Sequence, residues 1–393
     1  MKSKLSVPVL ALGVFGIITT EMGVIGVLGP VSDKFGITPA TAGWLVGVFA
    51  LVVALTGPFT TLLTSAYDRK SVLLVAIAVF AISNLVYATT SSFALMFAFR
   101  VIPAIAHPVF FAVALASAVR LAPPGAAAAT ATAAAAKVFT GVTIGFAFGV
   151  PLTAYLAENF SLSTAFAFGA VANLFAFIGI LALLPSSPVT RRMSYGAQIR
   201  ILRRPHVWLT IVSVTLIFAA MFSVYGYFAE YLHDVTGMSG TWISAMLLSF
   251  GVVMIFGNFL FGALLGRSVV RTVAAFPVLY IAVYAVVYVV GPYFAPMVVG
   301  VLIWGVVHSG GLVVAQSWMG IDAADAPEFG NSLFISFSNL GITVGTIVGG
   351  WSLDNFGAHR MIWSGVFFAG LALIAIAVRV SIDHRSADAV MAG

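Results

Sequence analysis

The chain contains very few charged residues. Of its 393 residues, 8% are charged and 61% are hydrophobic, and the mean hydropathy is +1.12. A soluble domain usually carries about 25% charged residues. No soluble core could enclose this much apolar surface, so the composition predicts a membrane protein built from helices.

Several catalytic and redox features are missing as well. The absence of cysteine excludes disulfides, thiol chemistry and cysteine metal sites. The sequence has no phosphate-binding Gly-x-x-x-x-Gly-Lys-Ser/Thr loop, no His-Glu-x-x-His and no Gly-x-Ser-x-Gly. We therefore expect a protein that is not an enzyme, needs no cofactor and draws energy from an ion gradient or from its substrate's own gradient. Arginines in loops explain the pI near 9.7, so no nucleic-acid partner is predicted.

Apolar runs of roughly 20 residues, each long enough to cross a bilayer, predict an all-α fold of about twelve transmembrane helices. The predicted spans are 6–30, 41–64, 72–90, 94–119, 127–156, 163–184, 207–231, 241–265, 271–291, 295–318, 329–352 and 360–380. The longest polar stretch lies midway and holds five arginines. It predicts a six-helix bundle over 1–184, a cytoplasmic linker over 185–205 and a second six-helix bundle over 206–393.

The basic residues predict the orientation. If the N-terminus is cytoplasmic, the outer side holds only Lys34 and Arg360, which is a strong positive-inside signal. An even number of spans then places both termini in the cytoplasm. In this topology Asp322 belongs to an inner loop and Arg379 lies on the inner side. The first apolar run has no cleavage site and is predicted to be a retained helix.

A glycine pattern occurs twice, 200 residues apart. Its members are Gly141, Gly145 and Gly149, and then Gly341, Gly345 and Gly349. Glycines four apart line one helix face and allow another backbone to come close. The matched offset predicts a duplicated transporter whose fifth span faces its eleventh through these glycines or lies at the equivalent seam. The alternative is two ordinary small-residue packing faces.

Three charged residues fall inside predicted spans of the first half: Glu21, Arg100 and Lys137. The ~1.5 Å rise per residue places them at similar heights, in the middle or outer half of the bilayer. His107 lies seven residues after Arg100, on the same helix face, and imidazole titrates near neutral pH. We predict a proton-coupling group of these four residues, in which Glu21 pairs with the bases and carries the proton. The alternatives are a static ion pair and a packed histidine.

The predicted spans of the second half contain no buried charge, but they contain polar and aromatic residues at depth. Such groups are typical of small-molecule cavities. The predicted substrate-binding residues are Tyr225, Tyr227, Trp304, His308, Gln316, Asn331, Ser338 and Asn339. The alternative is that the aromatic residues belong to the core or face lipid.

Several motifs together resemble the major facilitator superfamily, and most of all its bacterial drug:proton antiporter branch, which includes sugar-, arabinose-like, chloramphenicol- and purine-efflux transporters. The motifs are Thr19-Thr20-Glu21, Gly57-Pro58 with Asp68-Arg69-Lys70, Arg100 to His107, Gly149-Val-Pro151-Leu152 and Tyr225-x-Tyr227. The chain departs from the family's loop motif, because Ser71 and Val72 stand where a second glycine is usual.

The resemblance implies a monomeric, proton-coupled transporter that exports a small molecule across the bacterial inner membrane by alternating access. It implies conformational roles for Gly57, Asp68, Arg69, Pro151 and the repeated glycines. Two alternatives remain open at this point. One is a proton symporter or facilitator for uptake, and the other is a membrane sensor without transport.

Overall fold

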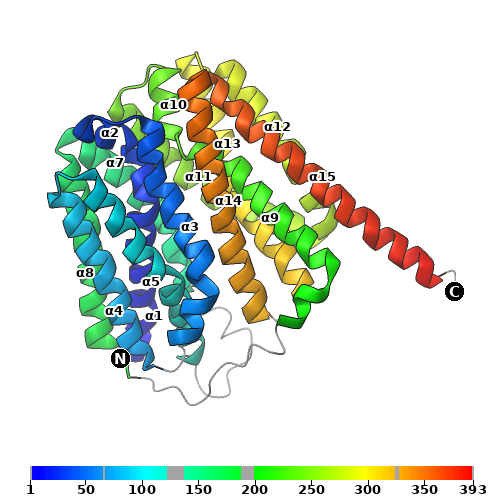
Figure 1. Cartoon of the computed structure of the whole chain (residues 1–393), viewed down its shortest axis with the longest axis horizontal. Helices are drawn as coiled ribbons and strands as arrows, with labels where there is room; N and C mark the ends of the chain where they lie inside the picture. Colours follow the sequence, from blue (N-terminus) through cyan, green and yellow to red (C-terminus); the bar gives the residue numbers. More distant parts are fainter. Residues whose placement is uncertain (1, 65–66, 122–136, 187–198, 324–326, 392–393) are drawn as a thin grey trace. The chain divides into compact units, whose positions relative to one another are not determined.

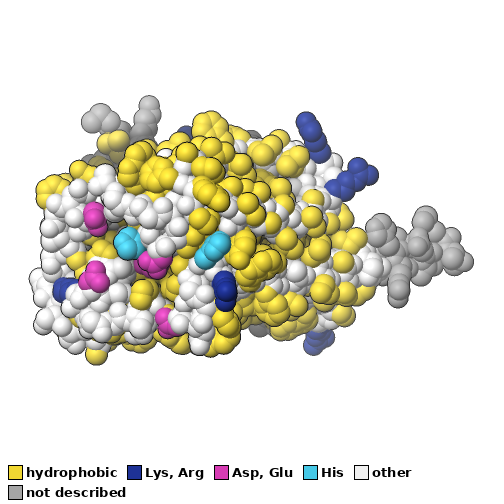
Figure 2. Space-filling model, turned by 90° about the horizontal axis from the view of Figure 1, so that it is seen from above, with side chains coloured by type: hydrophobic (Ala, Val, Ile, Leu, Met, Phe, Trp, Pro, Cys, Tyr) yellow, Lys and Arg dark blue, Asp and Glu magenta, His cyan; other side chains and the backbone are white. Residues whose placement is uncertain are grey.

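In this computed structural model, the described residues are all those except 1, 65–66, 122–136, 187–198, 324–326 and 392–393 (Figure 1). Every regular element among them is a helix, and twelve helices are long and apolar enough to span a membrane. The predicted fold class is therefore confirmed. Figure 2 shows the molecule from above, where hydrophobic side chains cover much of the visible surface and acidic, basic and histidine side chains lie among them.

The chain forms two compact units. The first contains residues Met1–Met193 and Met238–Gly251, and the second contains Ser194–Gly237 and Val252–Gly393. The helices in the first half of the chain are α1 Lys2–Met22, η1 Gly23–Val27, α2 Leu28–Phe35, α3 Pro39–Thr64, α4 Arg69–Thr89, α5 Phe93–Arg120, η2 Gly145–Gly149, α7 Val150–Asn159 and α8 Leu162–Leu183. Those in the second half are η3 Ile199–Arg203, α9 Pro205–Tyr225, α10 Phe228–Asp234, α11 Gly240–Arg267, α12 Val269–Val290, α13 Phe294–Asp322, α14 Pro327–Phe356 and α15 Ala358–Met391.

The unit boundaries differ from the predicted halves in one segment. The beginning of α11 groups with the first unit, where Gly251 packs directly on the backbone of Ala147 in the π-helical turn η2. The predicted linker 185–205 falls mostly on residues 187–198, which lie outside the described part of the chain. The domain boundaries themselves stay a prediction.

Several helix ends in the first unit are fixed by local sequence. Asp68 caps α4 by accepting a 3.0 Å hydrogen bond from the Ser71 amide, and Ser161 caps α8 in the same way through the Thr164 amide. Gly36 ends α2 with a φ of 64°, a left-handed conformation that glycine adopts without a steric penalty. The turns between spans therefore follow from single residues at their ends.

In the first unit, α1 packs against α8 and against the span that runs from Lys137 to Asn159. The three glycines of this span face α1. A Cβ atom on Gly141 would meet the Ala11 carbonyl, one on Gly145 would lie 2.6 Å from Ile18, and one on Gly149 would meet the Thr19 hydroxyl. The two backbones approach this closely because the glycines have no side chain.

The second unit repeats this arrangement around α9, which packs against α14 and α15. A Cβ atom on Gly341 would meet the Thr215 carbonyl, one on Gly345 would lie 2.6 Å from the Ala219 carbonyl, and one on Gly349 would meet the Ser223 carbonyl. Each glycine pattern thus packs on the first helix of its own half. This packing within each half fits the alternative of two small-residue packing faces, and a contact of the fifth span with the eleventh stays a prediction.

The first span of each half is broken at a matched point. Helix α1 ends at Met22 and continues through the 3-10 turn η1 into α2. Helix α9 ends at Tyr225, and α10 begins at Phe228. Such a break frees main-chain carbonyls, which need other hydrogen-bond donors inside a membrane.

Candidate proton and substrate sites

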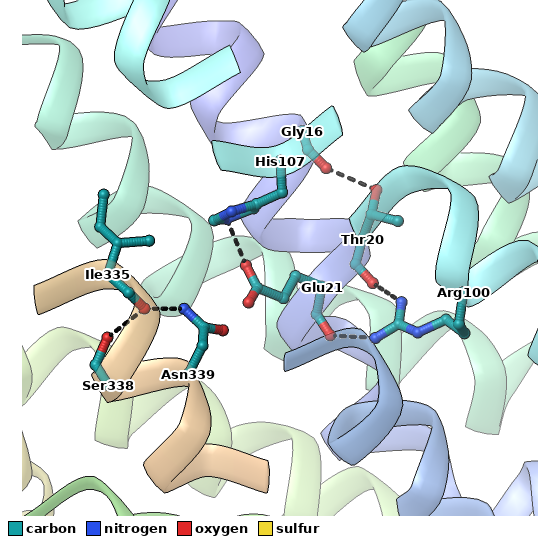
Figure 3. Close-up of polar contacts among 8 residues, drawn as sticks. All are labelled: Gly16, Thr20, Glu21, Arg100, His107, Ile335, Ser338 and Asn339. Atoms are coloured by element: carbon teal, nitrogen blue, oxygen red, sulfur yellow. Dashed lines mark hydrogen bonds and ion pairs between the residues drawn. The ribbon is translucent and has the colours of Figure 1, made fainter. Parts of the chain in front are cut away.

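Glu21 and His107 form a buried acid–imidazole pair. Nε2 of His107 lies 3.1 Å from Oε2 of Glu21, and both side chains are at most 7% exposed (Figure 3). The imidazole packs between Phe49 and Phe111, with ring centroids 5.7 Å and 4.6 Å away. Within the described residues, neither ring nitrogen of His107 has a hydrogen-bond partner, so the 3.1 Å contact with Glu21 is an ion-pair distance and not a hydrogen bond. The pair is therefore a place where one proton can be held between two titratable groups in an apolar wall.

Arg100 lies beside this pair but binds main-chain carbonyls. Its Nη1 donates to the Thr20 carbonyl at 2.8 Å and its Nη2 donates to the Glu21 carbonyl at 2.8 Å, as drawn in Figure 3. Its Nε donates to the Leu45 carbonyl at 2.9 Å. The guanidinium thus stabilises the carbonyls at the break after α1, with the Phe49 ring 4.8 Å away.

This geometry corrects the predicted pairing of Glu21 with Arg100. Two helices, α1 and α5, bring the acid, the arginine and the histidine together, as the sequence predicts. The carboxylate, however, faces the imidazole, while the guanidinium faces the backbone of the same glutamate. The Arg100 guanidinium and the Glu21–His107 pair are therefore neighbours, but the guanidinium binds main-chain carbonyls and the carboxylate contacts the imidazole.

Lys137 lies apart from these three residues. It is exposed, whereas Glu21, Arg100 and His107 are buried. Gly141, one turn further along the same span, packs on Ala11. Lys137 therefore lies at least ten residues before the height of Glu21 along α1, a distance of about 15 Å or more. The predicted common height of Lys137 and Glu21 is wrong.

A polar network that the sequence analysis missed surrounds Thr20. Its hydroxyl donates to the Gly16 carbonyl at 2.8 Å and accepts hydrogen bonds from Asn84 at 2.8 Å and Asn173 at 3.0 Å. Asn173 also donates to the Gly169 carbonyl at 2.8 Å. Asn84 and Asn173 are polar residues within predicted spans, and this feature of the sequence could have indicated the network. The network links α1 to α4 through Asn84 and to α8 through Asn173, at the residue before Glu21.

In the second unit, three of the predicted substrate-binding residues meet in one aromatic cluster. The Tyr225 and His308 rings have centroids 4.6 Å apart, and Trp304 packs edge-on against Tyr225. Tyr280, which was not predicted, joins them: its hydroxyl lies 2.8 Å from His308 Nδ1 and accepts a 3.2 Å hydrogen bond from the Trp304 indole. All four side chains are buried, so in this conformation the cluster is closed to a solute.

The remaining predicted substrate-binding residues are more scattered. Tyr227 is buried and donates a 2.9 Å hydrogen bond to the Thr346 carbonyl. Ser338 and Asn339 are buried on α14, and both donate to the Ile335 carbonyl, at 3.0 Å and 2.9 Å (Figure 3). Asn331 is half-buried and Gln316 is exposed.

The two sites occupy matched positions on duplicated helices. Glu21 is the penultimate residue of α1, and Tyr225 is the last residue of α9, so each stands at the break in the first span of its half. Each contacts a histidine 86 or 83 residues further along the chain, His107 and His308 respectively. The second half therefore places a phenol where the first half places an acid.

Most of the residues with predicted conformational roles lie at or near helix ends, and Gly57 lies within a helix. Asp68 caps α4 and accepts a 2.9 Å hydrogen bond from Ser186. Arg69 is the first residue of α4, and Gly57 is buried within α3. Pro151 is the second residue of α7, which begins directly after the π-helical turn η2. The places of these residues in the structure do not show whether they act in gating, so that role stays a prediction.

Buried charges in the second unit contradict the expectation of none. Asp322 and Arg379, predicted to lie on the inner side, form a buried ion pair with an Nη2–Oδ1 distance of 2.7 Å. Thr210 donates a 2.5 Å hydrogen bond to the same carboxylate. Glu230 is also buried, within the span that includes α10, so Glu21 is not the only acid inside a span.

Comparison with known proteins identifies the family. The model of the Major Facilitator Superfamily matches residues 10–346. The chain belongs to this superfamily. It is 27% identical over 376 residues to the inner membrane transport protein YdhP of Escherichia coli (strain K12), covering 95% of this chain and 96% of that one. It is 28% identical over 363 residues to the purine ribonucleoside efflux pump NepI of the same organism, covering 92% and 90%.

Solved structures of superfamily transporters share the fold. The nucleoside transporter NupG, in its D323A mutant, superposes with a TM-score of 0.76 at 14% identity and covers 96% of this chain and 99% of its own. A bacterial homologue of the lysosomal transporter Spinster gives a TM-score of 0.73 at 16% identity, with coverage of 97% and 95%. The superfamily member described here is thus a multi-pass inner-membrane transporter of small solutes, and not an enzyme.

Proposed function

We propose that this superfamily member exports a small molecule across the bacterial inner membrane in exchange for protons, by alternating access. The single observation that carries the proposal is the Glu21–His107 pair, because a buried carboxyl group lies 3.1 Å from an imidazole, a group that can accept a proton. An intramembrane carboxylate that can be charged or neutral is suited to coupling with a proton gradient.

In the proposed cycle, Glu21 takes a proton from the outer side, the substrate leaves outward, and the proton is released inside. His107 shares the proton with Glu21 through the 3.1 Å contact. Arg100 does not titrate, and it keeps the helix break in place in both protonation states. Proton and substrate need not share a site; they need only favour opposite states of one two-state protein.

The proposed substrate is a drug, sugar or nucleoside-like molecule. A nucleoside is favoured among these, because one relative is named as a purine ribonucleoside efflux pump and one structural neighbour as a nucleoside transporter. The side chains Tyr225, Trp304 and His308 offer a stacking surface with polar edges, which suits a purine ring once the cluster opens. We place both termini in the cytoplasm and expect the transporter to act as a monomer.

The test uses purified protein in liposomes that hold a pH gradient of chosen sign. A panel of labelled purine nucleosides, sugars and amphiphilic drugs is presented in both gradient directions, for the wild type and for Glu21→Gln. Exchange with protons predicts accumulation on the acidic side, with loss of uphill transport in the variant. Accumulation on the alkaline side would support the alternative, a proton symporter. No flux of any solute would favour the non-transporting sensor.

A further inference from the structure

A groove lies between the last two spans, away from the sites described above. It has a volume of about 440 Å³ and is lined by residues of α14 and α15 only. These are Val348, Trp351, Ser352, Phe356, Arg360, Trp363, Ser364 and Phe367. They recur three or four residues apart on each helix, so two facing helix stripes form its walls.

The walls are aromatic and face outward. Trp351, Phe356, Trp363 and Phe367 are each more than half exposed, although they belong to two helices that pack together. The two serines are buried, and Ser364 already donates a 2.7 Å hydrogen bond to the Met361 carbonyl. A polar solute would form few hydrogen bonds here, because binding such a ligand requires several polar side chains that point into the groove.

One charge stands at the end of the groove. Arg360 is exposed in the first turn of α15, close to the turn where α14 ends at Phe356. Among the residues that the structure describes, it forms no hydrogen bond or ion pair. Phe367 lies seven residues further along the helix, about 10 Å deeper in the apolar region. The groove therefore presents a cation at headgroup level and an aromatic surface at acyl-chain depth.

We propose that this groove binds one anionic phospholipid, with its phosphate on Arg360 and an acyl chain along Trp351, Trp363 and Phe367. A guanidinium can donate two parallel hydrogen bonds to a phosphate, which a lysine cannot match. Tyr288 and His359 support the wall, because the His359 ring stacks on Tyr288 at 4.1 Å and Trp363 packs on Tyr288 at 5.5 Å. The aromatic surface is thus held in place before a lipid arrives.

The proposal is tested with the full-length protein in mixed micelles containing phosphatidylglycerol or phosphatidylcholine at low ratios. Native mass spectrometry counts the lipids retained by each molecule. We expect one phosphatidylglycerol to be retained in preference to phosphatidylcholine. Arg360→Gln should weaken this binding about five-fold, the effect expected of one basic residue near a lipid headgroup. Lys34→Gln, which removes another exposed charge, should leave it unchanged.

A photoactivatable phosphatidylglycerol with a label on its acyl chain locates the lipid. Adducts should map to α14 and α15 around Trp363 and should fall in Trp363→Ala. Phe259→Ala, which alters an aromatic side chain 75% exposed on α11, serves as the control. Equal binding by wild type and Arg360→Gln, or adducts elsewhere, would overturn the proposal. So would loss of labelling on adding transport substrate, or a dimer whose formation depends on Trp363.

Discussion

Arg100 donates a hydrogen bond to the main-chain carbonyl of Glu21, while the carboxylate of the same residue faces His107. One residue therefore meets a fixed charge with its backbone and a titratable group with its side chain. This separates two roles that a simple acid–arginine pair would combine. Mutations at the three positions should consequently give different phenotypes.

Glu21→Gln should abolish uphill transport driven by a pH gradient and retain at most passive exchange of substrate. The amide cannot lose or gain the proton, so it imitates the neutral acid permanently. The measurement is flux into liposomes with and without a pH gradient. Asp33→Asn, which removes an exposed acid of the same half, should transport normally. Full gradient-driven transport by Glu21→Gln would move the proton to His107.

Arg100→Ala should reduce transport about ten-fold or more while the protein still reaches the membrane. Three hydrogen bonds to main-chain carbonyls are lost at the helix break, and about 1.4 kcal/mol already corresponds to a factor of ten. Arg100→Lys should recover only part of the activity, because one ammonium cannot reproduce the planar fork. Activity like the wild type in either variant contradicts the role in fixing the break. Arg271→Ala is the control at an exposed arginine.

Gly145→Leu should impair folding or transport, since even its Cβ atom would lie 2.6 Å from Ile18. Overpacking of this kind costs typically about 1–3 kcal/mol. Gly370→Leu is the matched control, because a Cβ atom there meets nothing within 4 Å. Thermal unfolding in detergent and substrate flux should both separate the two variants. Equal behaviour would show that the α1 contact is not tight.

Asp322→Ala should lower the free energy of unfolding by about 3–5 kcal/mol, because it leaves Arg379 buried without its acid. Thr210→Val should cost less, about 1.5–3 kcal/mol, since it removes one hydrogen bond to the carboxylate. Tm measured in detergent gives the order of the two effects. Asp354→Asn, at an exposed acid, should leave Tm unchanged. A smaller loss for Asp322→Ala than for Thr210→Val would contradict the buried pair.

The sequence predicts the fold well because the bilayer restricts the possible structures. Twelve apolar runs can only be helices, and the repeated glycines indicate where backbones approach. It predicts the meeting of Glu21, Arg100 and His107 through their motifs. It does not predict which atoms meet, because the choice between carbonyl and carboxylate depends on where α1 breaks and on how each side chain turns.

The errors have physical causes as well. Counting residues from a guessed span end misplaced Lys137, whereas Gly141, one turn later, packs on Ala11, ten residues before Glu21 in α1. Asp322 ends α13 and Arg379 lies near the end of the membrane span Ala358–Ile382, where sequence position alone does not distinguish an exposed charge from a buried pair. Tertiary packing determines the height of Lys137 and the burial of the Asp322–Arg379 pair, and the hydropathy of the sequence carries no information about that packing.

The acid–histidine contact of the first half and the phenol–histidine contact of the second have unequal consequences. A phenol carries no charge at neutral pH, whereas a carboxyl group can carry one, so the matched positions Glu21 and Tyr225 differ in their chemistry. The two halves therefore differ at this matched position, with a carboxyl group beside His107 and a phenol beside His308. Tyr225→Glu would restore the chemical symmetry, and we expect it to add a second proton-binding step to the titration of transport.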